Sequence, residues 1–143
     1  MRFPPAAPAN RGQPQCGVML VLEHLNVEEC NIVNTVDEEV ELVERVGHPN
    51  FQCLLDTYHF WRDKIPLEQL ERAMPHIRHV HLADVEGRVA PGESGKPDYR
   101  GVFAILKKGG YKGLVSVEAP GFGDFAGLGP KVLAFLKRQW SEA

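Results

Sequence analysis

The sequence predicts an α/β fold in which four β-strands alternate with helices. Three observations support this prediction. Short apolar runs recur four times in the 143 residues, each is followed by a segment with helical spacing of its apolar side chains, and the first run is continuously apolar. Strands joined by helices run parallel in such folds, so we expect four βα units in one sheet.

The composition is that of an ordinary globular protein of one domain. It is 43% hydrophobic and 24% charged, with net charge −3 and no basic stripe, which argues against a dedicated nucleic-acid-binding protein. The longest apolar stretch, 18–22, is too short to cross a membrane. Cys16, Cys30 and Cys53 form no CxxC pair and are expected to be reduced thiols. We therefore expect a cytoplasmic protein without nucleic-acid or membrane partners.

The first predicted unit follows a proline-rich start. Residues 1–15 hold four of the eleven prolines and lack the apolar region of a secretory signal, so we expect a flexible leader ahead of a domain over 16–143. The run over 17–23 (GVMLVLE) predicts a strand buried on both faces, as is typical of parallel sheets.

A helix is predicted over 36–46, where valines recur at helical spacing. Thr35 and Glu38 can form a capping box at its start, and Gly47 can end it. The later units are predicted as a strand over 51–56, a helix starting near Pro66 and stopping at Pro75, a strand over 77–84, a helix capped by Asp98 and closed by Gly109 and Gly110, a strand over 114–118, and a last helix opened by Gly129 and Pro130.

Each predicted strand carries, at or near its carboxyl end, a side chain that can bind a metal or move a proton: Glu23, Asp56, His81 and Glu118. The carboxyl ends of parallel strands converge on one face, so these residues are expected to meet. Any one of them alone is more often a loop cap or a core residue, but four in successive strands predict a shared site. Carboxylate and imidazole ligands without a thiolate suit Mn²⁺, Mg²⁺, Co²⁺ or Zn²⁺.

Residues 85–97 form a long segment without a helical or strand pattern, and loops of this length are usually functional or disordered. Arg88 and Lys96 make a sugar or phosphate clamp the functional interpretation, and a flexible connector is the alternative. The glycines of 121–123 could approach a ligand, although a plain turn explains them better.

Four segments of the chain resemble the sugar phosphate isomerase/epimerase family of xylose-isomerase-like TIM barrels, which includes hydroxypyruvate isomerases and ketose 3-epimerases. They follow the family's order and spacing from about Gly17 to about Trp140: LEHLN at 22–26, HPNFQCLLDTYH at 48–59, HVHLADVEGRVAPGESGKPDY at 79–99 and GYKGLVSVEAP at 110–120. The resemblance implies the parallel (βα)4 half of a (β/α)8 barrel, equivalent to strands 5–8.

The resemblance also implies roles for individual residues. In that family one divalent cation, often Mn²⁺, is held by the residues that match Glu23, Asp56, His81 and Glu118. The two glutamates, Glu23 and Glu118, act as the catalytic acid/base pair in the ketose epimerases. Family substrate contacts match Glu29, His59 and Arg88, with Glu28 as an alternative to Glu29.

We therefore expect a divalent-metal-dependent sugar isomerase or epimerase that acts on a ketose or a small hydroxy-keto acid through a cis-enediolate. A catalytically incomplete fragment or half-barrel binding module is one alternative, and an endonuclease-IV-like phosphodiesterase with three metal ions is another. Four strands cannot close a barrel and leave two apolar edges. We expect a fragment, a chain completed by a separate N-terminal half-barrel or, ranked lowest, a homo-oligomer.

Overall fold

The computed structural model describes residues 17–95, 98–120 and 124–143. The expected leader over 1–15, Cys16, Lys96 and the turn over 121–123 lie outside the described residues. The described chain runs through the elements β1 (Leu20–Glu23), α1 (Val36–Val46), β2 (Phe51–Asp56), α2 (Thr57–Arg62), α3 (Leu67–Ala73), β3 (Ile77–Leu82), the short 3₁₀ helix η1 (Glu86–Arg88), α4 (Arg100–Lys108), β4 (Leu114–Val117) and α5 (Phe125–Glu142).

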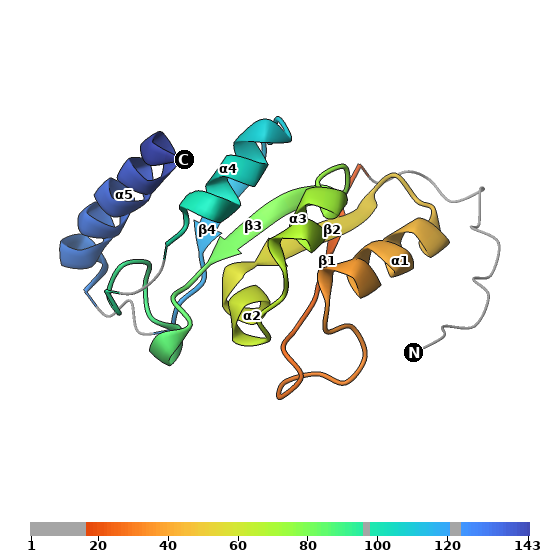
Figure 1. The fold of residues 1–143 in the computed structure, drawn as a ribbon, viewed down its shortest axis with the longest axis horizontal. Helices are drawn as coiled ribbons and strands as arrows, with labels where there is room; N and C mark the ends of the chain where they lie inside the picture. Colours follow the sequence, from red (N-terminus) through yellow and green to blue (C-terminus); the bar gives the residue numbers. More distant parts are fainter. Residues whose placement is uncertain (1–16, 96–97, 121–123) are drawn as a thin grey trace.

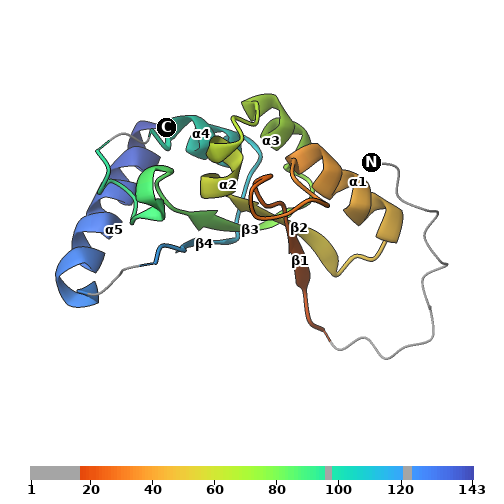
Figure 2. The same cartoon turned by 90° about the horizontal axis from the view of Figure 1, so that it is seen from below.

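The four strands form one parallel sheet in the order β1-β2-β3-β4 (Figure 1). Helices α1, α3 and α4 lie together on one side of this sheet (Figure 2). Strand order therefore follows chain order, and every strand is joined to the next through helical segments. This confirms the predicted series of βα units, which corresponds to part of an α/β barrel.

The hydrophobic core lies between the sheet and these helices. Side chains alternate along the carboxyl-terminal parts of β2 and β3, so that Cys53, Leu55, Val80 and Leu82 enter this core while the residues between them face the opposite side of the sheet. The fully buried core side chains include Leu55 and Val80 of the strands, Phe60 of α2, Leu70 of α3, and Val102 and Leu106 of α4. The helices packed against this face hold the strands in place, and therefore fix the positions of the carboxyl ends of the strands.

The ends of α1 follow the predicted signals. The Thr35 hydroxyl accepts a hydrogen bond from the Glu38 amide at 3.2 Å, and Glu38 Oε2 accepts one from the Thr35 amide at 3.2 Å. Gly47 ends the helix with φ 62°, a left-handed conformation, and its amide donates to the Val43 carbonyl. The capping box and the glycine stop are confirmed.

The prediction that the first strand is buried on both faces is wrong. β1 begins at Leu20, whose side chain is 61% exposed, because β1 is an edge of the described sheet with no strand outside it. At the other edge, Leu114 of β4 is 75% exposed. Both edges are apolar, as expected for four strands that do not close into a barrel.

The helix boundaries differ from the prediction at three places. Helix α2 follows β2 with no intervening loop, which hid it from the sequence pattern. Helix α4 has Tyr99 as its N-cap, while Asp98 accepts from the Arg100 amide at 3.0 Å. Helix α5 begins at Phe125, not at Gly129, because Asp124 caps it by accepting from the Gly127 amide. Pro130 consequently lies inside α5, where it removes one backbone hydrogen bond.

None of the helices in the described residues is both long enough and apolar enough to cross a membrane.

Candidate metal centre

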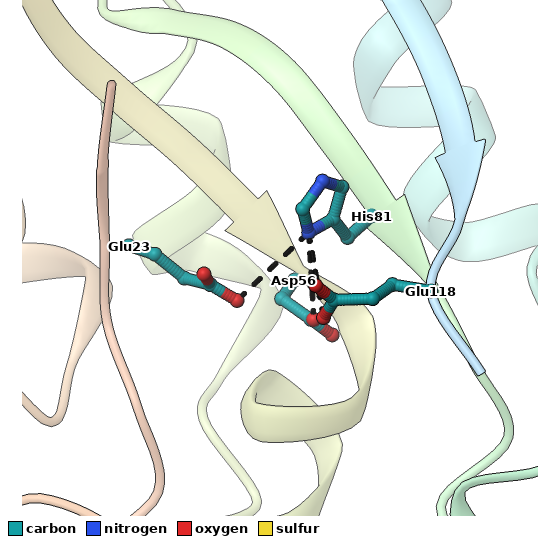
Figure 3. A group of neighbouring side chains, drawn as sticks. All are labelled: Glu23, Asp56, His81 and Glu118. Atoms are coloured by element: carbon teal, nitrogen blue, oxygen red, sulfur yellow. Dashed lines mark ion pairs between the residues drawn. The ribbon is translucent and has the colours of Figure 1, made fainter. Parts of the chain in front are cut away.

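Four side chains at the carboxyl ends of the strands gather at one place (Figure 3). Glu23 ends β1, Asp56 ends β2, His81 is the penultimate residue of β3, and Glu118 follows β4. One potential ligand atom from each of them lies within 4.8 Å of those of the other three. The structure thus brings together the residues that the sequence places at the four strand ends.

The register of the sheet explains this convergence. Asp56 is the direct neighbour of His81 across the β2–β3 ladder, and Glu23 is the neighbour of Leu54, two residues before Asp56 and on the same face. The Glu118 amide donates to the Leu82 carbonyl at 3.1 Å, which extends the β3–β4 ladder and keeps Glu118 at the rim.

Three atoms of this group are buried and have no hydrogen-bond partner: Glu23 Oε1, Asp56 Oδ2 and His81 Nδ1. The other Asp56 oxygen, Oδ1, accepts from the Tyr58 amide at 2.7 Å, so the capping interaction of α2 turns Oδ2 toward the site. Buried polar atoms without partners are costly unless an ion or a water binds them. The three atoms point toward one another, which fits a cation bound between them.

The distances fit one ion as well. His81 Nδ1 lies 3.6 Å from Glu118 Oε2, 3.9 Å from Asp56 Oδ2 and 4.0 Å from Glu23 Oε1. Two ligands that each lie about 2.1 Å from one ion can be at most about 4.2 Å apart, which the three His81 distances satisfy. The whole group spans up to 4.8 Å, so its side chains would move together by a few tenths of an ångström around an ion. Three carboxylates and one imidazole suit a divalent cation such as Mn²⁺, Mg²⁺, Co²⁺ or Zn²⁺.

The electrostatics of the group favour a cation. Burial, together with the nearby carboxylates of Asp56 and Glu118, raises the pKa of Glu23 to about 8, while Arg88 opposes this rise. Carboxylates are thus crowded at this point, and a divalent cation would offset their mutual repulsion.

His59, which was expected to contact substrate, lies beside the group. Its Nε2 is 3.7 Å from Glu23 Oε1, and its side chain is 1% exposed. The Asn26 amide donates to His59 Nδ1 at 3.1 Å, which places the ring proton of the neutral imidazole on Nε2, facing Glu23. Burial lowers the pKa of His59 and so favours this neutral form.

Arg88 and Glu29 lie on the solvent side of the same group. Arg88 donates to Glu118 Oε2 at 2.8 Å, and its Nη1 lies 3.7 Å from Glu29 Oε2. Its guanidinium also stacks over the Tyr58 ring at 4.7 Å from the centroid. The alternative residue, Glu28, points elsewhere and pairs with the exposed Arg62. Of the two glutamates, Glu29 is the one near the site.

Asn26 and Tyr58 also contact site residues, although no motif in the sequence pointed to them. Asn26 Nδ2 donates to Glu29 Oε1 at 2.8 Å in addition to the contact of Asn26 with His59. Both residues lie within segments that carried the family resemblance, but their contacts depend on the position of α2 against the loop after β1, which no local pattern reveals.

A protein with this half-barrel and a carboxylate–histidine group at its strand ends belongs to a known class. Residues 13–139 match the model of the xylose isomerase-like TIM barrel family, so the chain belongs to that family. It is 35% identical over 113 residues to an inosose isomerase of Halalkalibacterium halodurans, covering 71% of this chain and 39% of the relative.

Solved structures agree with this assignment. The crystal structures of D-psicose 3-epimerase with D-tagatose, from Clostridium cellulolyticum H10, match with TM-score 0.67 and 32% identity, over 73% of this chain and 36% of that one. The IOLI protein with a bound zinc atom matches with TM-score 0.62 and 30% identity, over 72% and 40%. The chain thus spans well under half the length of these relatives.

Proposed function

We propose that this chain supplies the metal-binding half of a divalent-metal-dependent sugar isomerase or epimerase. The observation that carries the proposal is the group of Glu23, Asp56, His81 and Glu118, with ligand atoms within 4.8 Å and three buried atoms that lack partners. The relatives include an inosose isomerase and an epimerase solved with D-tagatose, which supports a ketose or small hydroxy-keto acid as substrate. The zinc-bound relative supports a divalent metal, for which we propose Mn²⁺.

The placement of the two glutamates suits proton transfer. Glu23 and Glu118 come from the two outer strands and reach in from opposite sides of Asp56 and His81 (Figure 3). One glutamate takes the proton from the carbon next to the substrate carbonyl, and the C–H electron pair forms the double bond of a cis-enediolate. The other returns a proton to the opposite face for epimerisation, or to the adjacent carbon for isomerisation. A divalent cation, when bound, stabilises the negative charge that develops on the substrate oxygens.

The surrounding residues are suited to binding and orienting the substrate. In this proposal His59 Nε2–H donates to a substrate oxygen near Glu23, and Arg88 and Glu29 bind hydroxyl groups at the open side of the site. Asn26 holds both His59 and Glu29 through its amide contacts.

The test is proton exchange in the metal-loaded protein. With Mn²⁺ and D-tagatose in D₂O, wild-type protein should incorporate deuterium next to the carbonyl, while Glu118→Gln with Mn²⁺ restored should lose at least about 100-fold in rate. Glu28→Gln removes an exposed glutamate away from the group and should retain the wild-type rate. Wild-type turnover by Glu118→Gln would exclude Glu118 as an acid or base.

The two alternative functions predict different metal contents. A three-metal phosphodiesterase needs further ligand clusters, but among residues 17–95, 98–120 and 124–143 one group of this kind is present. One Mn²⁺ per chain, measured by elemental analysis after gel filtration, is expected. Three ions would favour the phosphodiesterase, and one ion without any proton exchange would favour a half-barrel binding module.

We also propose that an N-terminal half-barrel, missing from these 143 residues, covers the two open edges of the sheet. Leu20 and Leu114 leave these edges apolar, and a groove of about 710 Å³ between β4 and α5 is lined by apolar residues including Val117, Phe125 and Leu133. Two copies of this chain would bring two sets of metal ligands into one mouth, which makes a homodimer less favourable. Gel filtration with mass detection on Mn²⁺-loaded protein tests this, because a stable homodimer would contradict the proposal.

A further inference from the structure

The loop after β3 is organised around one buried carboxylate. Asp84 is 0% exposed, and its side chain accepts hydrogen bonds from the Gly92 amide at 3.1 Å and from the Ser94 amide at 3.0 Å. The Ser94 hydroxyl donates to it at 2.8 Å, and so does the Tyr99 hydroxyl. Asp84 thereby ties the far end of the loop to the end of β3 and to the start of α4.

Asp84 also holds the near end of the loop, through its backbone amide. The Asp84 amide donates to the Val89 carbonyl at 3.0 Å, which encloses η1. Within this turn Arg88 has φ 49°, in the left-handed region that residues with side chains adopt when their surroundings enforce it. These hydrogen bonds hold the described residues 85–95 at both ends, which argues against the alternative of a flexible connector for this part of the loop.

Tyr99 connects Asp84 to the hydrophobic core. Its ring is fully buried, stacks on Phe103 at 5.9 Å between centroids, and meets Phe135 and Trp61 edge to face. Burial and the hydrogen bond to Asp84 raise the pKa of Tyr99, so its hydroxyl remains a donor to Asp84. The carboxylate is therefore anchored to the hydrophobic core rather than to other loop atoms alone.

We propose that Asp84, held by Tyr99, is a positioning residue that fixes residues 85–95 and thereby places Arg88 against Glu118. Neither Asp84 nor Tyr99 belongs to the candidate metal group, so they act through Arg88. The effect on substrate rests on the proposed function, whereas the effect on the loop and on Arg88 does not.

The substitution Asp84→Asn tests this role, because it turns one of the two acceptor oxygens into an NH2 donor, while the Gly92, Ser94 and Tyr99 groups that contact the carboxylate are donors. Trypsin should cleave the native chain after Arg88 at least about tenfold faster in Asp84→Asn than in wild type, and measurably faster in Tyr99→Phe. The control Asp98→Asn changes an exposed aspartate at the next helix and should keep the wild-type rate. If Asp84→Asn does not fold, Tyr99→Phe combined with Ser94→Ala replaces it.

A second measurement separates positioning from general stability. If Asp84 acts through Arg88, Asp84→Asn should change the Mn²⁺ affinity in the same direction as Arg88→Ala, and the double variant should match Arg88→Ala alone. Additive changes in affinity, or a wild-type cleavage rate after Arg88 in folded Asp84→Asn, would overturn the proposal. Absence of isomerase activity would contradict the proposed function alone, because trypsin cleavage and Mn²⁺ affinity do not depend on turnover.

Discussion

The Arg88 guanidinium donates to Glu118 Oε2 at 2.8 Å, and the same Nη2 atom lies 3.9 Å from Asp56 Oδ2. A permanent positive charge thus neutralises part of the carboxylate cluster at the point where a cation would bind. Arg88 therefore competes with a metal ion for Glu118 while it offers donors to a substrate at the open side.

Replacing Arg88 should strengthen metal binding. We expect Arg88→Ala to raise the Mn²⁺ affinity about fivefold, because removing a screened ion pair worth about 1 kcal/mol leaves Glu118 and Asp56 more available to the metal. Isothermal titration calorimetry measures this directly. The matched control is Arg62→Ala, which removes an arginine paired with exposed Glu28 and should leave the Mn²⁺ affinity unchanged. Weaker Mn²⁺ binding by Arg88→Ala would mean that Arg88 does not compete with the ion.

Asp56 should be indispensable for stabilisation by metal. Mn²⁺ at about 100 times its Kd should stabilise the wild-type protein by about 2.7 kcal/mol, seen as a rise in Tm. Asp56→Asn keeps the Oδ1 acceptor for the Tyr58 amide but replaces Oδ2, so the rise in Tm should disappear. Asp37→Asn, at an exposed position paired with Arg72, should retain the full rise. An undiminished Tm response in Asp56→Asn would remove Asp56 from the metal site.

The buried pair of His24 and Glu39 should make stability depend on pH. Glu39 Oε2 lies 3.0 Å from His24 Nδ1, Oε1 accepts from the Leu54 amide at 2.8 Å, and both side chains are fully buried. Burial raises the pKa of Glu39 above the value of 4.5 expected in the unfolded chain. The unfolded chain therefore loses this proton at lower pH than the folded protein does, so the contribution of Glu39 to stability declines as pH rises above 4.5.

Urea unfolding of wild type and Glu39→Gln at pH 5 and pH 8 measures this contribution. The stability of wild type relative to Glu39→Gln should fall between these two values, while exposed Glu41→Gln should show no such change. A difference between wild type and Glu39→Gln that is the same at both pH values would refute the assignment.

The capping box of α1 should contribute about 1 kcal/mol to folding. Thr35→Ala removes the acceptor for the Glu38 amide and should lower the free energy of unfolding by that amount. Thr35→Ser keeps the hydroxyl and should lower it by much less. Equal losses in both variants, measured by urea unfolding, would show that the Thr35 methyl group matters more than the cap.

Local patterns in the sequence determined the repeated strand and helix units, because apolar periodicity and capping signals act over a few neighbouring residues. The capping box at Thr35 and the limits of 51–56 were predicted to the residue. Strand-end positions also predicted which side chains would meet, since parallel strands end at the same edge. Helix α2 was not predicted and the start of α5 was predicted too late, because Asp56 and Asp124 cap helices that lie against flanking elements.

The tertiary structure alone decided how the site is supported and how it is charged. The burial of Asp56 and partial burial of Glu23, the contact of Arg88 with Glu118, and the anchoring of residues 85–95 by Asp84 all depend on segments far apart in the chain. Such contacts depend on distances of a few ångströms between side chains, and on exclusion of water from around them. Neither quantity is fixed by residue spacing, because both arise when the helices pack against the sheet.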